Sequence, residues 1–114
     1  MQTRGAYRQS EIDARAQVVK IAAEMLDGHM SFLQGAIIIR GLESSIGGVT
    51  FPDEDFIVFD GIVSETDHLP LPKQQPLWQP EALDRIKPEI NEKEYKARTE
   101  ATQACKNLIQ RFKV

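Results

Sequence analysis

Apolar residues in the first quarter of the chain recur three and four positions apart, which is the spacing of one face of an amphipathic helix. The line they form is Ile12, Ala16, Val19, Ala23 and Leu26, widened by Val18, Ala22 and Met25. Ser10 is suited to cap the start of this helix, and Asp27-Gly28 supplies a stop. We therefore expect a helix over residues 10–27, with residues 1–9 disordered ahead of it.

The next apolar segment has two interpretations. Ser31 can cap a helix with three apolar residues near one face, whereas the run over residues 36–39 has the composition of a buried strand. The three residues are Leu33, Ile37 and Leu42. The length of the segment and the serine favour the helix. Gly35 and Gly41 each weaken helix propensity by about 1 kcal/mol, so in a helix they suggest close contact with a neighbouring helix.

Residues 44–48 are two serines, an isoleucine and two glycines without a packing pattern, and we expect a mobile loop there. Residues 52–55, a proline followed by three acids, are typical of the first turn of a helix. The apolar residues that would share a face of that helix are Phe56, Phe59 and Ile62 or Val63. A β-hairpin over residues 56–63, turning at Asp60-Gly61, is the alternative. We prefer the helix because no other segment offers a partner strand.

Four prolines fall among the twelve residues from Leu69 to Pro80, which predicts an extended or irregular path over the surface. Its expected anchors are Leu69, Leu71, Leu77 and Trp78. A last helix is expected from Pro80 to Phe112, bent or restarted at Pro88, with a core-facing stripe. The stripe is Ala97, Ala101, Ala104 and Leu108 beside Cys105, Ile109 and Phe112. We predict an all-α fold, a single domain over residues 1–114 with four to five helices and an extended arm at 69–80.

Composition is consistent with one soluble domain. The 114 residues, 41% of them hydrophobic and 27% charged, are enough to bury one core without disulfides. The one cysteine, Cys105, cannot form an intramolecular bridge, so a reducing cytoplasm is the expected location. No apolar run approaches the ~20 residues that span a bilayer, and the N-terminal residues lack the apolar stretch of a signal peptide. A pI of about 5.4 argues against nucleic-acid binding.

Charge is distributed unevenly along the chain. Seven of the 17 acidic residues and none of the 14 Lys and Arg residues fall among residues 41–72, so the rest of the chain holds ten acids and all 14 bases. The seven are Glu43, Asp53, Glu54, Asp55, Asp60, Glu65 and Asp67. Soluble surfaces usually intersperse the two signs. This acidic segment therefore suggests a surface that attracts a cationic partner.

The sequence gives little support for a catalytic site. Residues 64–68 place Ser, Asp and His together, but a triad needs spatial rather than sequential adjacency, and no GxSxG motif accompanies them. Capping of a helix end is the better interpretation. The carboxylates and His68 could bind a hard cation, yet their spacing fits no known metal loop. Cys105 lies on the expected buried face of the last helix, which favours an inert thiol. We expect no catalytic residue, metal site or cofactor.

The stretch DEDFIVFDGIVSETDHLP from Asp53 to Pro70, followed by Trp78 and the string CKNLIQRF at residues 105–112, resembles a loosely defined group of small bacterial proteins. These have a helical beginning, a DEDF-like acidic turn, a SETDxLP-like segment, a tryptophan and a terminal helix. The resemblance covers the chain from about Ile21 onward and brings no catalytic residue with it. Members look like immunity proteins, which are small acidic cytoplasmic partners that neutralise toxins delivered between competing bacteria.

The resemblance implies a stoichiometric inhibitor rather than an enzyme, with a basic toxin domain as its partner. The charge distribution agrees, because an acidic inhibitor associates quickly with the basic surface of a nuclease toxin. The residues expected to contact the toxin are Asp53, Glu54, Asp55, Asp60, Glu65, Asp67, His68 and Trp78, with Phe51 as a second aromatic anchor. Two alternatives stay open. One is a small metal-assisted hydrolase that uses the carboxylates and His68, and the other is a structural or regulatory subunit that binds a basic protein.

Overall fold

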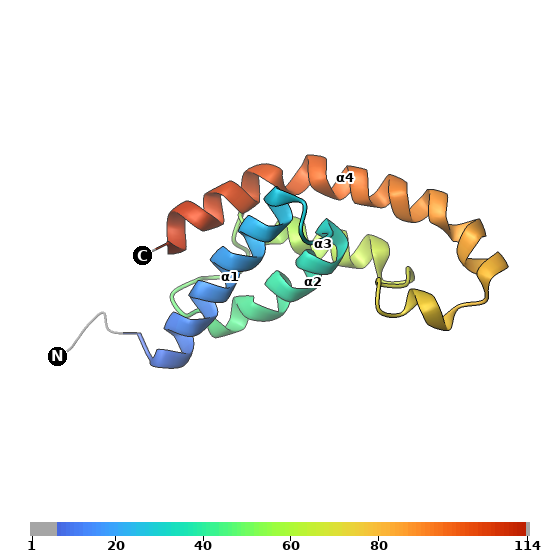
Figure 1. The fold of residues 1–114 in the computed structure, drawn as a ribbon. Coiled ribbons are helices and arrows are strands. Elements are labelled where there is room, and N and C mark those ends of the chain that lie inside the picture. The colour runs from blue at the N-terminus through green and yellow to red at the C-terminus, as the bar shows by residue number, and fades with distance from the viewer. Residues whose placement is uncertain (1–6, 114) are drawn as a thin grey trace.

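The computed structural model describes residues 7–113, which form four α-helices and two short 3₁₀-helices (Figure 1). These elements are α1 (Gln9–Asp27), α2 (Phe32–Leu42), η1 (Glu43–Ser45), α3 (Ile57–Thr66), η2 (Gln75–Leu77) and α4 (Pro80–Phe112). No β-strand occurs within residues 7–113. The predicted all-α fold is therefore confirmed, and residues 36–39 and 57–63 are helical rather than extended.

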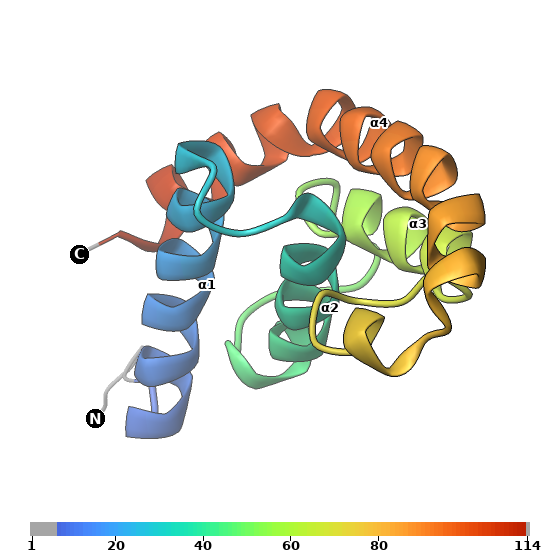
Figure 2. The ribbon, with the colours of Figure 1, turned by 45° about the vertical axis from the view of Figure 1, so that its right-hand side comes forward.

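The longest element, α4, covers the other three helices. Its 33 residues extend over about 50 Å, and Figures 1 and 2 show it arching across α1, α2 and α3. Its predicted apolar stripe is confirmed. The buried residues are Ala97, Ala101, Ala104, Cys105, Leu108 and Phe112. Pro88 lies inside α4 without interrupting it, so the helix does not restart there.

The core faces of α1 and α2 differ from the predicted ones, whereas α3 buries Phe59 and Ile62 as expected. Ile12 and Ile37, members of the predicted faces, are 45% and 40% exposed. Part of each predicted face is buried, namely Val18, Ala22 and Met25 in α1 and Leu33 in α2. The other buried residues are Ala14 and Ile21 in α1, and Phe32, Gly35, Ala36 and Ile39 in α2. Apolar residues cover so much of both helices that periodicity alone leaves their rotation open, and packing against neighbouring helices decides it.

The ends of α1 follow local chemistry. Gly28 closes the helix with a φ of +83°, a left-handed conformation that glycine adopts without strain. At the other end the predicted Ser10 cap is wrong, because Arg8 precedes the first turn and its N–H donates to Glu11 Oε1 at 2.8 Å. Of residues 1–9, expected to be disordered, Gln9 begins the helix. Residues 1–6 lie outside the described part.

The start of α2 is capped twice. Ser31 accepts a hydrogen bond from the N–H of Gln34 at 2.9 Å, as expected. In addition, Glu94 of α4 accepts from the N–H groups of Phe32 at 2.7 Å and Leu33 at 3.4 Å. A carboxylate is favourable here because the helix dipole makes this end positive. Glu94 therefore joins α2 to α4 across 62 positions of the sequence.

The acidic turn before α3 differs from the prediction. Residues 52–55 are not the first turn of the helix, since α3 begins at Ile57. They form a separate turn in which the carbonyl of Asp53 accepts from the N–H groups of Phe56 at 3.0 Å and Ile57 at 2.8 Å. The expected mobile loop at residues 44–48 is also more ordered than predicted. Its Ile46 is fully buried, and Arg15 donates to the carbonyl of Ile46 at 2.8 Å.

The proline-rich segment is a series of turns and not the predicted extended arm. Pro72 occupies the second position of a turn that closes with the N–H of Gln74 donating to the carbonyl of Leu71 at 2.8 Å, and η2 follows directly. Proline suits such positions because its fixed φ is near −65°. Leu69 is buried as an anchor, but Leu77 is 85% and Trp78 36% exposed. Leu71 is half-buried, so the expected anchoring is present at Leu69, partial at Leu71 and Trp78, and absent at Leu77.

The two glycines of α2 provide a matched test of this packing. A Cβ on Gly35 would lie 2.6 Å from Met25 Cγ and would overlap its Sδ, whereas a Cβ on Gly41 would meet nothing within 4 Å. Met25 is fully buried, so its side chain must repack to accept the extra methyl group. We expect Gly35→Ala to lower the free energy of unfolding by about 1–3 kcal/mol through overpacking.

Gly41→Ala should instead raise that free energy by up to about 1 kcal/mol through helix propensity. Urea unfolding followed by circular dichroism measures both variants. Equal effects of the two substitutions would show that α1 and α2 do not pack in this way.

Candidate protein-binding surface

One side of α3 is largely exposed. Its residues follow the helical spacing of three and four, and all are exposed except Asp60, which is half-buried. They are Ile57, Asp60, Gly61, Ser64 and Asp67, and we call this set the α3 face. Ile57 is 47% exposed, and a Cβ on Gly61 would meet nothing within 4 Å. This side of the helix is therefore accessible at its surface.

A hollow of about 420 Å³ lies at the N-terminal end of the α3 face. Its lining residues are Arg40, Glu43, Ser44, Val49, Phe51 and Asp60, and we call it the Phe51 hollow. The Phe51 side chain is 66% exposed. Arg40 Nε lies 3.2 Å from Asp60 Oδ1, so one of the two acids is paired across the hollow.

Glu43 is the unpaired acid of this hollow. Its Oε2 is buried and has no hydrogen-bond partner among the described residues. Burial raises the pKa of the Glu43 carboxyl above its ordinary value, and repulsion from Asp60 and Asp53 adds to the effect.

A shallow depression of about 330 Å³ lies at the other end of the α3 face. Its lining residues are Asp67, His68, Leu69, Pro70, Gln74, Leu77 and Trp78, and we call it the Trp78 depression. His68 Nε2 and Glu89 Oε2 are 2.7 Å apart, so α4 fixes the imidazole ring. The structure thus brings together Asp67, His68 and Trp78, three of the residues expected to contact a partner.

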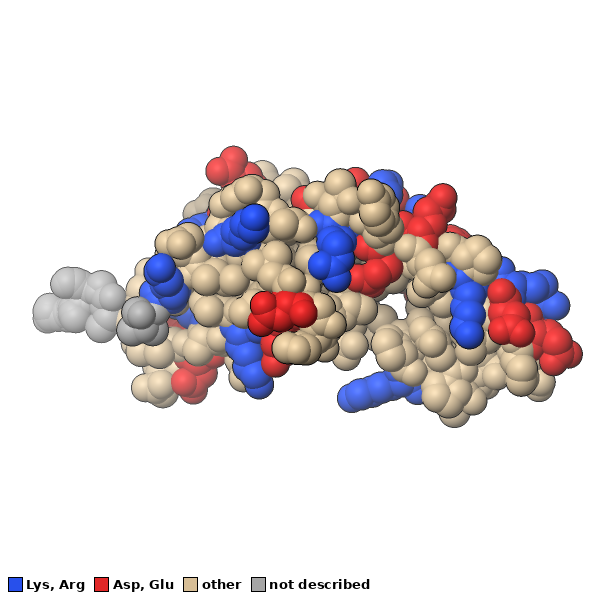
Figure 3. All heavy atoms as spheres, turned by 45° about the horizontal axis from the view of Figure 1, so that its top comes forward, with Lys and Arg blue, Asp and Glu red and all other residues tan. Residues whose placement is uncertain are grey.

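An apolar groove of about 210 Å³ borders this depression and shares Leu69 and Pro70 with it. Leu33, Leu71 and Ile90 contribute further apolar walls, and Glu94 closes one side. In Figure 3 an opening separates the right-hand end of the molecule from its main body. Nothing in the sequence pattern indicated this groove, because it lies between segments that are distant along the chain.

Three other acids of the segment, Asp53, Asp55 and Glu65, are bound within the protein. Asp53 and Asp55 pair with Arg111, and Glu65 lies 2.7 Å from Lys96 Nζ and 3.5 Å from Lys93 Nζ. Of the eight residues expected at the partner surface, only Glu54 and Asp67 are acids without an ion pair to a described residue. Acidic and basic side chains also lie close to each other on the face shown in Figure 3.

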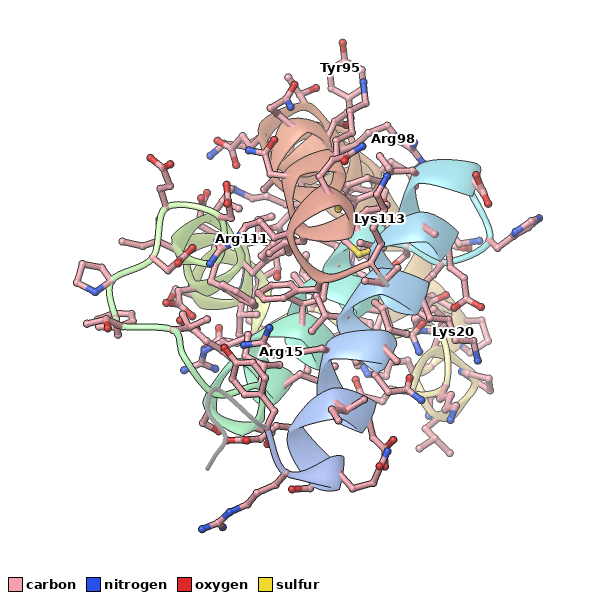
Figure 4. The ribbon with its side chains drawn as sticks, turned by 90° about the vertical axis from the view of Figure 1, so that its left-hand side faces the viewer. Arg15, Lys20, Tyr95, Arg98, Arg111 and Lys113 are labelled. Carbon is pink, nitrogen blue, oxygen red and sulfur yellow. The ribbon has the colours of Figure 1, made fainter. Side chains whose placement is uncertain are left out.

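The contact made by Arg111 is the most complete of these. Nη1 donates to Asp53 Oδ1 at 2.8 Å and to Asp55 Oδ2 at 2.9 Å, and Nη2 donates to Asp53 Oδ2 at 3.1 Å. Asn107 donates to the remaining Asp55 oxygen at 2.9 Å. Figure 4 shows Arg111 reaching from α4 toward the segment before α3. These bonds hold the acidic turn against the last turns of α4, so they stabilise the fold.

The residues considered for catalysis have the following surroundings. His68 bonds to Glu89, while Ser64 is exposed on α3. Within residues 7–113 no group of three or more His, Cys, Asp and Glu side chains is placed to hold a metal ion. Burial raises the pKa of the Cys105 thiol to about 12, which is that of an unreactive cysteine.

Comparison with known proteins adds no assignment. No protein family matches the chain, and no curated protein or solved structure matches it either. In the part of the chain that the structure describes, no helix combines the length and the apolar character needed to cross a bilayer.

The Arg111 contacts predict a loss of stability on substitution. Arg111→Ala leaves Asp55, which is 8% exposed, with only Asn107 as a side-chain partner. We expect the free energy of unfolding to fall by about 1–3 kcal/mol, the cost of a buried charged group left without a donor. Lys106→Ala, an exposed change on the same helix, should alter it by less than about 0.5 kcal/mol. Chemical unfolding of both variants tests this, and equal stability of the two would contradict it.

The same contact predicts a pH dependence. The hydrogen bonds from Arg111 lower the pKa of Asp53 from its ordinary value of 3.8, mainly because they favour the ionised form. Asp53 therefore stabilises the fold above its unfolded pKa, and this contribution is lost as the pH falls through the lowered folded pKa. Unfolding free energies measured from neutral pH down to about pH 3 should decline less steeply at the acidic end for Arg111→Ala than for the unmodified protein.

Proposed function

We propose that this protein is a stoichiometric inhibitor that binds and neutralises a toxin in the bacterial cytoplasm, with the α3 face and its two flanks as the binding surface. The observation that carries the proposal is the exposure of Leu77 and Trp78 beside Asp67 and His68. Large apolar groups exposed together are typical of interaction sites, and tryptophan is enriched among residues that dominate binding energy.

The prolines around these two residues support a binding role. Pro76 lies in η2 and Pro80 opens α4, so the backbone on both sides of Leu77 and Trp78 is restrained. A side chain presented by a restrained segment loses less conformational entropy on binding than one on a flexible loop. The proline-rich segment thus prepares an apolar contact point instead of burying it in the core.

Charge supports a basic partner. The chain has a net charge of −3, and Glu54 and Asp67 carry charges that no described base neutralises through an ion pair. Charges of this kind steer an oppositely charged protein toward the surface and raise the association rate. A toxin as the basic partner rests on the resemblance to immunity proteins. A metal-assisted hydrolase or a regulatory subunit gains no comparable support from a particular contact.

The exposed pair predicts the effect of substitution on the complex. With the product of an adjacent toxin gene as partner, Leu77→Ala and Trp78→Ala should each raise the dissociation constant about 10–100-fold, the range expected for residues that dominate an interface. Tyr95→Ala is the matched control, because Tyr95 is 74% exposed but lines neither the hollow nor the depression. Calorimetry gives the constants, and native mass spectrometry the one-to-one stoichiometry. Absence of a complex would refute the proposal.

The salt dependence of the binding rates should separate long-range electrostatic attraction from short-range contacts in the complex. Raising ionic strength shortens the Debye length to about 3 Å at 1 M, so the association rate should fall severalfold while the dissociation rate changes little. Stopped-flow kinetics measures both rates. A salt-independent association rate would exclude a role for the negative charge.

A further inference from the structure

The Phe51 hollow combines three features that recognise a planar cation. Phe51 offers an exposed aromatic ring, and Glu43 and Asp60 each contribute a carboxylate group to the lining. Arg40 is the only base among the lining residues and is paired with Asp60, so the hollow keeps an excess of negative charge. Both carboxylates come from helical or 3₁₀ segments, which hold them in place.

An arginine side chain satisfies these features better than a lysine. A guanidinium group carries five N–H donors in one plane and can bond a carboxylate while its face stacks on an aromatic ring. A lysine ammonium is a compact and strongly hydrated point charge. Stacking of this kind already occurs within the protein, since the guanidinium of Arg15 lies 3.8 Å from the ring centre of Tyr7, and that of Arg98 lies 4.8 Å from the ring centre of Phe32. No described arginine or lysine stacks on Phe51.

We infer that the Phe51 hollow receives an arginine side chain of the partner protein, which bonds Glu43 and stacks on Phe51. The identity of the partner as a toxin rests on the proposed function, but the chemistry of the hollow does not. The hollow and the Trp78 depression then act as two contact points at opposite ends of the α3 face, one for a cation and one for an apolar group.

The hollow can be tested without any partner. N-acetyl-arginine amide, titrated into ¹⁵N-labelled protein, should shift the amide resonances of residues 40–44, 49–51 and 60 with a dissociation constant in the millimolar range, as expected for one side chain. The citrulline analogue, which has the same shape without the charge, should leave them unchanged. The lysine analogue should bind more weakly. Equal shifts with citrulline, or shifts spread over the whole surface, would overturn the inference.

Substitutions locate the binding. Phe51→Ala and Glu43→Gln should each weaken arginine-amide binding at least about tenfold, a loss of about 1.4 kcal/mol. Glu92→Gln, which removes an exposed acid of α4 that does not line the hollow, is the control and should leave it unchanged. Thermal unfolding confirms that each variant is folded. Glu43→Gln keeps the size of the side chain, so loss of binding in this variant cannot be attributed to a collapsed hollow. Unchanged binding in both hollow variants would overturn the inference.

Measurements with the toxin distinguish this inference from the proposed function. If the toxin binds the unmodified protein and both hollow variants equally well, the arginine assignment is wrong while the inhibitor function stands. If the arginine amide binds as expected but the toxin does not, the inhibitor function is wrong while the hollow remains an arginine site. Loss of toxin binding in both hollow variants, but not in Glu92→Gln, supports the two together.

Discussion

The structure depends on the packing of one long apolar stripe on α4 against three shorter helices. Helices of 10 and 11 residues such as α3 and α2 are marginal in water by themselves. They persist here because α4 buries part of each of them along the same stripe, which runs from Ala97 to Phe112. The small residues of the stripe allow close approach. Glu94 adds a directional contact by capping α2 from α4.

This arrangement also decides what the acidic segment does. The segment itself contains no Lys or Arg. Its acids pair instead with bases from α4 and α2, namely Arg111, Lys93, Lys96 and Arg40. Ion pairs of this kind stabilise the fold where they are partly buried and hydrogen-bonded, as at Arg111, and contribute little where exposed. Much of the charge that looked available for a partner is therefore used within the protein. What remains exposed gathers at the α3 face and at Glu54.

Two local features of the sequence keep the α3 face and its flank accessible: small residues on α3 and prolines after Leu69. Gly61 has no side chain and that of Ser64 is small, so the middle of this face carries no bulky side chain. The prolines after Leu69 fold the next segment into turns that end with Leu77 and Trp78 exposed. The exposed Leu77 and Trp78 side chains and the Phe51 hollow thus lie at the two ends of the α3 face. Two separated contacts recognise a partner more selectively than either does alone, because both must fit at once.

Local sequence determined the helical class, the closing glycine of α1, the Ser31 cap and the buried stripe of α4, since each depends on residues within one or two turns. It could not determine which face of α1 or α2 is buried, because their apolar residues surround much of the helix. Local sequence also pointed to Asp67, His68 and Trp78 as candidate binding residues. That they and the Phe51 hollow lie at opposite ends of one helix face depends on how α3 packs against its neighbours. The acids Asp53, Asp55 and Glu65 looked alike in sequence to Asp67. Only the tertiary structure separated them, because their counter-ions lie 28 to 58 residues away along the chain.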